Sequence, residues 1–142
     1  MKRLALVLAL IPLAAACARG PFDDVDITAV ELRWAPRLEF LKARVGMSFL
    51  EVRFEFANKG SAPLTLKALD FSLRDTAGQL YPYSAQVLNL GQPRGVAEAR
   101  IEAGQRVSGS VVFQVPERAV PADLIYRQDV GSGLAISLKA SR

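Results

Sequence analysis

The residue types on which enzymes most often rely are scarce in this chain. Its 142 residues contain no histidine and a single cysteine, Cys17. Histidine is the commonest general base and the commonest metal ligand, so its absence excludes a Ser-His-Asp triad and zinc sites built on histidine. Cys17 has no histidine to activate it as a nucleophile, and one cysteine can form neither an internal disulfide nor a cysteine-based zinc site.

Two carboxylates, Asp70 and Asp75, are the next candidates for acid–base chemistry. Asp70 has the opposite parity to Phe71 on an expected strand, and Asp75 opens the turn Asp75–Gly78. Alternating side chains face opposite sides of a strand, and aspartate often bonds its own backbone at a turn. We therefore expect a solvated Asp70 and an Asx turn at Asp75, and the sequence predicts no catalytic residue, metal, cofactor or enzyme activity.

Aromatic residues offer a second kind of candidate site. Tyr81, Tyr83 and Tyr126 could stack on a ligand. The alternative, which we favour, is that they are partly buried aromatics of the fold whose hydroxyls stay in water. Trp34 is expected in the core.

Two loops that contain arginine are the preferred contact candidates. Arg94 lies in Gln92–Gly95, and Arg118 lies in Glu117–Val120. Recognition residues concentrate on loops that a rigid scaffold presents, so Arg94 and Arg118 are the residues we single out for binding.

The N-terminus has the features of an export signal. Lys2 and Arg3 precede an unbroken apolar run, Leu4–Ala16. Thirteen helical residues span about 20 Å, which is short of the ~30 Å hydrocarbon core of a bilayer. The segment is therefore predicted to be a cleaved signal peptide and not a transmembrane helix.

The end of the apolar run, Leu13–Cys17, resembles the lipobox of bacterial lipoproteins. The resemblance implies that Cys17 receives diacylglycerol before the signal peptide is cut, although Ala14 occupies the position where a large apolar residue is usual. An alternative is ordinary secretion, because Ala14–Ala16 also fits an A-x-A cleavage site. We favour lipidation. Ala18 after the cysteine resembles the pattern of enterobacterial lipoproteins, and this resemblance implies the outer membrane if the host has one.

These signals divide the chain into a signal peptide (1–16), a lipidated cysteine with a tether (17–26) and one domain (27–142). The tether carries three acidic residues, which could hold a cation but fit a solvated linker better: Asp23, Asp24 and Asp26. No further oxygen ligands at calcium-loop spacing follow them.

The charge pattern excludes nucleic acid as a partner. Loss of Lys2 and Arg3 lowers the formal charge from +4 to +2. Basic and acidic residues are interleaved, as in Glu51–Glu55, so no basic patch is available to follow a phosphate backbone.

Apolar residues at every second position predict strands throughout the domain. The clearest is Leu50–Phe56, in which apolar residues alternate with Glu51, Arg53 and Glu55. Further strands are expected at Val30–Trp34, Leu38–Val45, Leu64–Leu73 with a corner near Ala68–Leu69, Gln79–Tyr83, Val107–Val115, Leu124–Tyr126 and Leu134–Leu138. Ser84–Ala97 is expected to be a crossing loop. Seven or eight short strands indicate an all-β antiparallel sandwich or small barrel.

A family resemblance supports the sandwich. Its motifs are Val52-x-Phe54-x-Phe56-x-Asn58-x-Gly60, Pro63-Leu64, Phe71-x-Leu73-x-Asp75-x-x-Gly78-x-x-Tyr81 and Ile101-x-x-Gly104-x-x-x-x-Gly109-x-Val111-x-Phe113-x-Val115-Pro116. In these the chain resembles a bacterial immunoglobulin-like domain family of unknown function, which is common in exported lipoproteins and similar in fold to a mycobacterial secreted antigen. The resemblance implies an immunoglobulin-like sandwich and carries no catalytic residue. A family of bacterial proteinase inhibitors shares part of the pattern, but the ending Phe113-x-Val115-Pro116 favours the first family.

We therefore expect a lipoprotein of the cell envelope, anchored on the extracytoplasmic side of a membrane, that acts as a non-catalytic binding or structural module. Its expected partners are the membrane, through the lipid anchor, and an envelope protein. The alternative is a proteinase inhibitor that presents Gly91–Gly95 or Pro116–Pro121 as a rigid loop. An envelope enzyme limited to carboxylates or hydroxyls ranks third.

Overall fold

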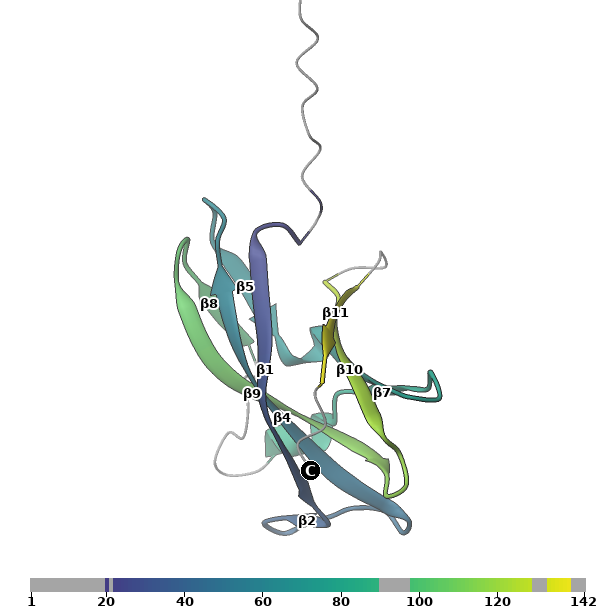
Figure 1. The fold of residues 1–142 in the computed structure, drawn as a ribbon. Coiled ribbons are helices and arrows are strands. Elements are labelled where there is room, and N and C mark those ends of the chain that lie inside the picture. The colour runs from purple at the N-terminus through teal and green to yellow at the C-terminus, as the bar shows by residue number, and fades with distance from the viewer. Residues whose placement is uncertain (1–19, 21, 90–97, 129–132, 139–142) are drawn as a thin grey trace, which may run out of the picture.

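Two antiparallel sheets face each other in this protein (Figure 1). The computed structural model describes residues 20, 22–89, 98–128 and 133–138. The first sheet has the order β1(Val25–Ala35), β4(Met47–Asn58), β9(Arg106–Pro116). The second has the order β11(Leu134–Ser137), β10(Pro121–Tyr126), β6(Phe71–Asp75), β7(Leu80–Pro82). The expected all-β antiparallel sandwich is confirmed.

Two small hairpins and two 3-10 turns complete the described part of the chain. They are β2(Arg37–Leu38) with β3(Leu41–Lys42), β5(Leu64–Lys67) with β8(Glu98–Ile101), η1(Ala68–Asp70) and η2(Ala85–Asn89). The expected strand at 38–45 is therefore a short hairpin whose pairing ends at Lys42. The expected crossing loop begins with η2, and its residues 90–97 lie outside the described part.

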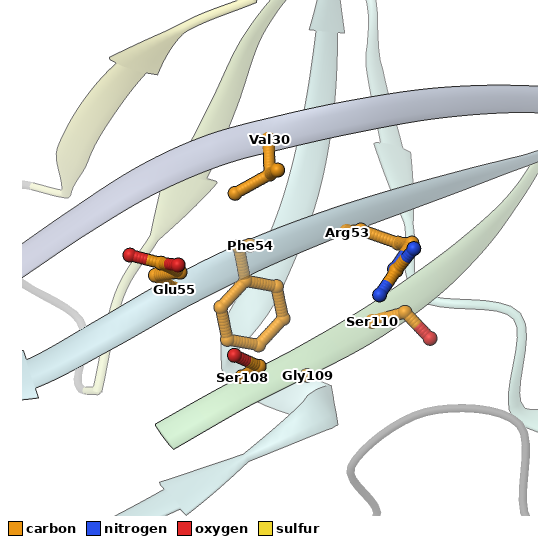
Figure 2. A pocket seen from close by; sticks show the side chains of 7 residues that line it. All are labelled: Val30, Arg53, Phe54, Glu55, Ser108, Gly109 and Ser110. Carbon is orange, nitrogen blue, oxygen red and sulfur yellow. The ribbon is translucent and has the colours of Figure 1, made fainter. Parts of the chain in front are cut away.

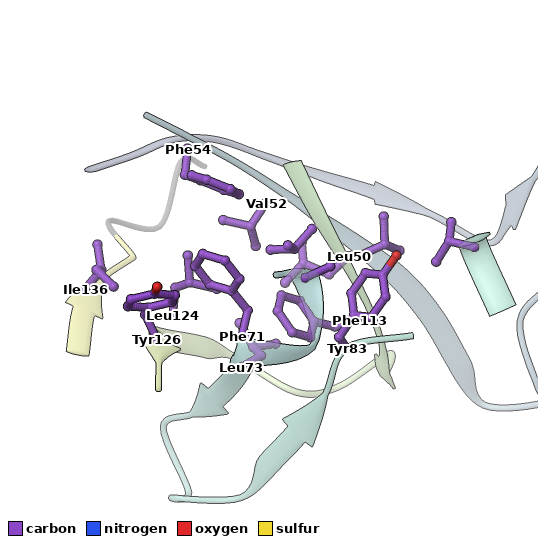
Figure 3. Packing of buried hydrophobic residues seen from close by; sticks show 14 of the residues in the cluster. Leu50, Val52, Phe54, Phe71, Leu73, Tyr83, Phe113, Leu124, Tyr126 and Ile136 are labelled. Atoms are coloured by element: carbon purple, nitrogen blue, oxygen red, sulfur yellow. The ribbon is translucent and has the colours of Figure 1, made fainter. Parts of the chain in front are cut away.

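Alternation along β4 builds the core between the two sheets. Leu50, Val52, Phe54 and Phe56 are all at most 1% exposed. Figure 3 shows the side chains of β4 facing Phe71, Leu73 and Leu124 of the opposite sheet. Phe71 is the centre of an aromatic group, with ring centroids 5.0 Å from both Phe54 and Tyr126. Because burial of an aromatic side chain removes a large apolar area from water, this group is a main source of stability.

The expected corner at Ala68–Leu69 is confirmed. β5 pairs with β8, whereas β6 pairs with β10 and β7, so the chain changes sheet through η1. The 3-10 turn shifts the parity of the apolar positions, which lets Leu66 and Phe71 both be buried. Leu69, within the turn, is 70% exposed.

A bulge in β1 corrects the expectation that Val30, Leu32 and Trp34 share one face. Ala29 pairs with Phe54 and Glu31 pairs with Arg53, so Val30 is the extra residue. An extra residue reverses the alternation of the strand. Leu32 and Trp34 therefore share a face with Ala29, whereas Val30 is 59% exposed.

One part of the first sheet is buried on both faces. Phe49 and Val112 point away from Leu50 and Phe113, yet each is at most 1% exposed. The segment that leads into η2 lies along the edge of β9 here, since the N–H of Ser84 donates to the carbonyl of Val112 at 2.8 Å. Val87 of η2 is fully buried in the same core cluster as Phe49 and Val112. Burial of both faces gives β9 four consecutive buried residues at this point, Ser110–Phe113, where simple alternation would leave two of them in water.

The sandwich has two ends that differ in their loops. At the N-terminal end the chain enters at Phe22–Val25, beside the loops at 59–63 and 102–105. At the opposite end, here called the distal end, lie the last residues of β1 with Pro36 and three loop segments: 39–40, 43–46 and 117–120. They are joined by bonds from Ser48 Oγ to the Ala35 carbonyl at 3.1 Å, from Ala43 N–H to the Pro36 carbonyl at 3.1 Å and from Glu117 N–H to the Gly46 carbonyl at 3.1 Å.

Candidate functional site

Two of the three residues singled out from the sequence, Cys17 and Arg94, lie outside the described residues. The first residues that the structure describes are Gly20 and Phe22. Phe22 already packs on the core, with its ring 6.1 Å from that of Tyr126, and β1 starts at Val25. The folded domain thus begins a few residues before the expected boundary at Ile27. No helix in the described ranges is long and apolar enough to cross a membrane.

The acidic residues near the N-terminus serve the fold. Asp23 Oδ2 accepts a hydrogen bond from the N–H of Gly20 at 2.6 Å, and Asp26 forms an ion pair with Lys59 at 3.1 Å. The backbone carbonyl of Asp24 accepts the N–H of Lys59 at 2.7 Å. Across the described residues no cluster of three or more potential ligand side chains could hold a metal ion.

Asp70 and Asp75 lie at opposite ends of β6 and do not form a carboxylate pair. The Asx turn is confirmed: Asp75 Oδ1 accepts the N–H groups of Ala77 and Gln79, both at 2.9 Å. Its Oδ2 accepts the hydroxyl of Tyr81 at 2.9 Å. Burial favours a higher pKa for Asp75, but these hydrogen bonds outweigh it and hold the pKa below its usual range.

Asp70 is partly buried. Burial raises the pKa of its carboxyl, and the opposing attraction of Lys67 is smaller. Its backbone carbonyl accepts the N–H of Arg127 at 2.8 Å, which ties η1 to the end of β10. The two aspartates therefore perform separate structural tasks.

The three tyrosines do not form a stacking patch, and the expectation of water-exposed hydroxyls is wrong for two of them. Tyr126 is fully buried, and its hydroxyl accepts a hydrogen bond from Gln128 Nε2 at 2.6 Å. Tyr83 is 6% exposed, and its buried hydroxyl has no hydrogen-bond partner among the described residues. Tyr81 is half-buried against Asp75. The three tyrosines thus lie apart: Tyr126 in the core, Tyr83 at its edge and Tyr81 at the turn of Asp75.

Trp34 was expected in the core but is 43% exposed. It pairs with Leu50 near the end of the first sheet. The second sheet does not cover that end of β1, so the indole stays partly in water. Strand periodicity predicts which face a side chain takes but not whether another layer covers it.

Asn58, a polar residue of the motif Val52–Gly60, is buried and has a structural role that the sequence did not predict. Asn58 is 1% exposed. Its Nδ2 donates to the carbonyls of Ala62 at 2.8 Å and Ile101 at 3.1 Å, and its Oδ1 accepts the N–H of Gly60 at 3.0 Å. The amide therefore closes the loop after β4 on itself and fastens it to the end of β8. The sequence signal for this role was the position of Asn58 in the motif, where a strand ends and a turn begins.

A shallow hollow of about 360 Å³ lies on the outer face of the first sheet. Figure 2 shows Arg53 and Ser110 on one side of it, and Glu55 and Ser108 on the other. They face outward because they alternate with the core residues of β4 and β9. The bulge residue Val30 lines its rim.

The charges of the hollow are already paired. Arg53 Nη1 lies 2.9 Å from Glu31 Oε2, and Arg106 Nη1 lies 3.2 Å from Glu55 Oε2. Ser108 and Ser110 supply hydroxyls, and the chain holds no histidine to deprotonate them. The hollow can hydrogen-bond a small polar group but does not assemble a nucleophile with its base.

Arg118, the third residue singled out, is exposed in a turn at the distal end. The turn is fixed by three backbone bonds: Glu117 N–H to Gly46, Ala119 N–H to Pro116, and Thr76 N–H to the Val120 carbonyl. The loop is therefore held on both sides, and it presents Arg118 beside the loop before β4.

Comparison with known proteins decides the family. A protein-family profile described as a domain of unknown function (DUF4352) matches residues 23–136, which include both sheets except Ser137, the last residue of β11. The chain belongs to this family. The immunoglobulin-like resemblance inferred from the motifs is confirmed, and no activity is assigned to the family. Among curated proteins, none matches the chain.

Solved structures show the same fold. The yjhA protein of Bacillus subtilis matches with a TM-score of 0.56 at 16% identity, over 82% of this chain and 92% of its own. The secreted protein MPT63 of Mycobacterium tuberculosis matches with 0.59 at 15%, over 80% and 82%. A Bacillus subtilis protein described as a candidate lipoprotein (ycdA) matches with 0.62 at 16%, over 84% of this chain and 38% of its own. These neighbours share the β-sandwich fold of this chain.

Proposed function

We propose that this protein is a lipoprotein of the bacterial cell envelope, held on the extracytoplasmic side of a membrane through Cys17, whose sandwich is a non-catalytic binding or structural module. The observation that carries the proposal is the position of the only cysteine, at the end of the apolar run and five residues before the first core residue, Phe22. A short tether of this kind would hold the domain close to the bilayer. Two or three acyl chains on one cysteine give stable anchoring.

Similarity to a secreted protein and to a candidate lipoprotein supports an extracytoplasmic location. The non-catalytic role is supported by the absence of histidine from the sequence and by the separate structural tasks of Asp70 and Asp75. Two parts of the surface are open to a ligand or partner: the hollow over Arg53 and Glu55, and the loops of the distal end.

Metabolic labelling with radioactive palmitate tests the anchor. The chain expressed in a bacterial host should incorporate label, and globomycin, which blocks the lipoprotein signal peptidase, should cause an unprocessed precursor to accumulate. The matched control is Cys17→Ser, which should incorporate none. If the unaltered chain takes up no label and is released into the medium, ordinary secretion is the correct reading and the anchor is discarded.

A further inference from the structure

Large apolar side chains are exposed mainly at the distal end. Seven such residues are exposed in the described part of the chain, and four are at this end: Trp34 at 43%, Phe40 at 70%, Val45 at 104% and Val120 at 54%. The other three are scattered: Val30, Leu69 and Leu80. Single exposed apolar residues are ordinary, but a group at one end of a domain indicates an interaction surface.

The β2–β3 hairpin holds Glu39 in a backbone conformation that is unfavourable for residues other than glycine or asparagine. Leu38 pairs with Leu41, so Glu39 and Phe40 form a two-residue turn. Glu39 has a φ of 51°, a left-handed conformation that two-residue hairpins require and that glycine or asparagine usually fills. Unfavourable backbone is often retained where it serves a function, and here it holds Phe40 at the tip of the hairpin.

Basic residues surround these apolar tips. Arg37 and Lys42 face each other across the hairpin, Arg44 precedes Val45, and Arg118 lies in the neighbouring turn. Within the described residues none of these four forms an ion pair. The acidic residues of the same loops are Glu39 and Glu117, so the distal end is positive.

The shape of the distal end suits a flat partner. Phe40 and Val45 are carried by separate loops and project from the surface, as their exposures of 70% and 104% show. In Figure 1 the β2–β3 turn and the loop before β4 reach the same lower margin of the molecule, opposite the start of β1. A partner with a flat surface can contact Phe40 and Val45 at the same time, whereas a partner with a narrow cleft would enclose only one of them.

We propose that the distal end binds an anionic lipid bilayer. Phe40, Val45 and Trp34 enter the interfacial region, where aromatic side chains are favoured, and the basic residues around them meet headgroup phosphates. The surface lies at the end of the sandwich away from Phe22, so in the anchored protein it would meet a second membrane surface and not the bilayer that holds Cys17. The binding itself does not depend on acylation of Cys17.

Co-sedimentation with vesicles tests the surface without the anchor. The chain from residue 17 with Cys17→Ser contains the whole sandwich, since every core residue lies between Phe22 and Leu138. It should bind vesicles of phosphatidylcholine mixed with phosphatidylglycerol, and binding should weaken as salt is raised. Vesicles of phosphatidylcholine alone should bind at least tenfold more weakly.

Two variants and a matched control sharpen the test. Phe40→Ser with Val45→Ser should weaken binding by about tenfold or more, and Arg37→Gln with Lys42→Gln should weaken it by about fivefold for each charge removed. The control carries the same kinds of change around η1 and the end of β10, away from the distal end, and should bind normally: Leu69→Ser, Lys67→Gln and Arg127→Gln. Circular dichroism verifies that each variant is folded. Absence of binding to the anionic vesicles, or equal loss in the control, would overturn the proposal.

Discussion

The two ends of the sandwich differ in whether their polar groups are paired and whether their apolar side chains are buried. At the N-terminal end the buried amide of Asn58 makes three hydrogen bonds, and the hydroxyl of Tyr126 is bonded to Gln128. Ion pairs join Lys59 to Asp26 and Arg100 to Glu102 in the loops around them. At the distal end, Phe40 and its neighbours are exposed, and four basic residues have no ion-pair partner among the described residues.

The difference separates residues that hold the fold from residues that are available to a partner. A buried polar group that loses its hydrogen bonds is costly, so the network at the N-terminal end must be complete for the domain to be stable. Exposed apolar and basic side chains contribute little to stability, so the distal end can change with small effect on folding. Substitutions at the two ends should therefore differ in kind.

The largest effect is expected for Asn58→Ala. The substitution leaves the buried carbonyl of Ile101 without its hydrogen bond and releases the loop that Gly60 closes. The free energy of unfolding should fall by about 2–4 kcal/mol, measured by urea denaturation.

The matched control for Asn58 is Gln105→Ala at the same end. Gln105 is exposed, and its side chain makes one bond, to the N–H of Glu102 at 2.9 Å. Its loss should cost less than about 1 kcal/mol. Equal losses at the two positions would mean that burial of Asn58 is not what makes its bonds important.

Alkaline unfolding should depend on Tyr126. Burial, with a smaller contribution from Asp70, raises the pKa of its hydroxyl to about 12. The unfolded chain releases this proton near pH 10. The contribution of the protonated hydroxyl to the free energy of unfolding is therefore fully present below pH 10 and is lost as the pH rises toward 12. Tyr126→Phe should cost about 1 kcal/mol at neutral pH through loss of the bond to Gln128. Urea denaturation at a series of pH values should show the difference from the unaltered chain shrinking above pH 10; a constant difference would mean that the hydroxyl titrates normally in the fold.

Much of the fold was predictable because it follows from local alternation. Leu50–Phe56 reports its own buried face, and the parity change at Ala68–Leu69 predicts the corner that η1 makes. The Asx turn at Asp75 was predictable for the same reason, since an aspartate bonds backbone groups two and four residues further along the chain.

Features that depend on a second layer were not predictable. The exposure of Trp34 depends on where the opposite sheet stops, and the burial of Val112 depends on the segment that pairs with β9 and continues into η2. The bulge at Val30 inserts one residue without any glycine or proline to mark it. The distal surface joins loops that are up to about 80 positions apart in sequence, so no local pattern could have assembled it.

A smaller effect, of opposite sign to that of Tyr126, is expected for Tyr83. Its hydroxyl is buried without a hydrogen-bond partner among the described residues, whereas that of Tyr126 is bonded. Removal of an unbonded buried hydroxyl relieves a desolvation cost, so Tyr83→Phe should leave stability unchanged or raise it by up to about 1 kcal/mol. Urea denaturation beside Tyr126→Phe makes the comparison direct. A loss of stability in Tyr83→Phe would show that this hydroxyl is satisfied.

The smallest effect on folding is expected for Phe40→Ser. The ring is 70% exposed at the tip of a two-residue turn, so its removal leaves no cavity and exposes no buried polar group. The free energy of unfolding should change by no more than about 0.5 kcal/mol in urea. Val45→Ser, in the adjacent loop, should behave in the same way. A loss above about 1 kcal/mol would mean that Phe40 packs against the domain, and the distal end would then resemble the N-terminal end in holding the fold. If Phe40→Ser leaves stability unchanged, stability does not explain why an exposed aromatic follows the unfavourable backbone of Glu39. This is the condition expected of a residue that contacts a partner.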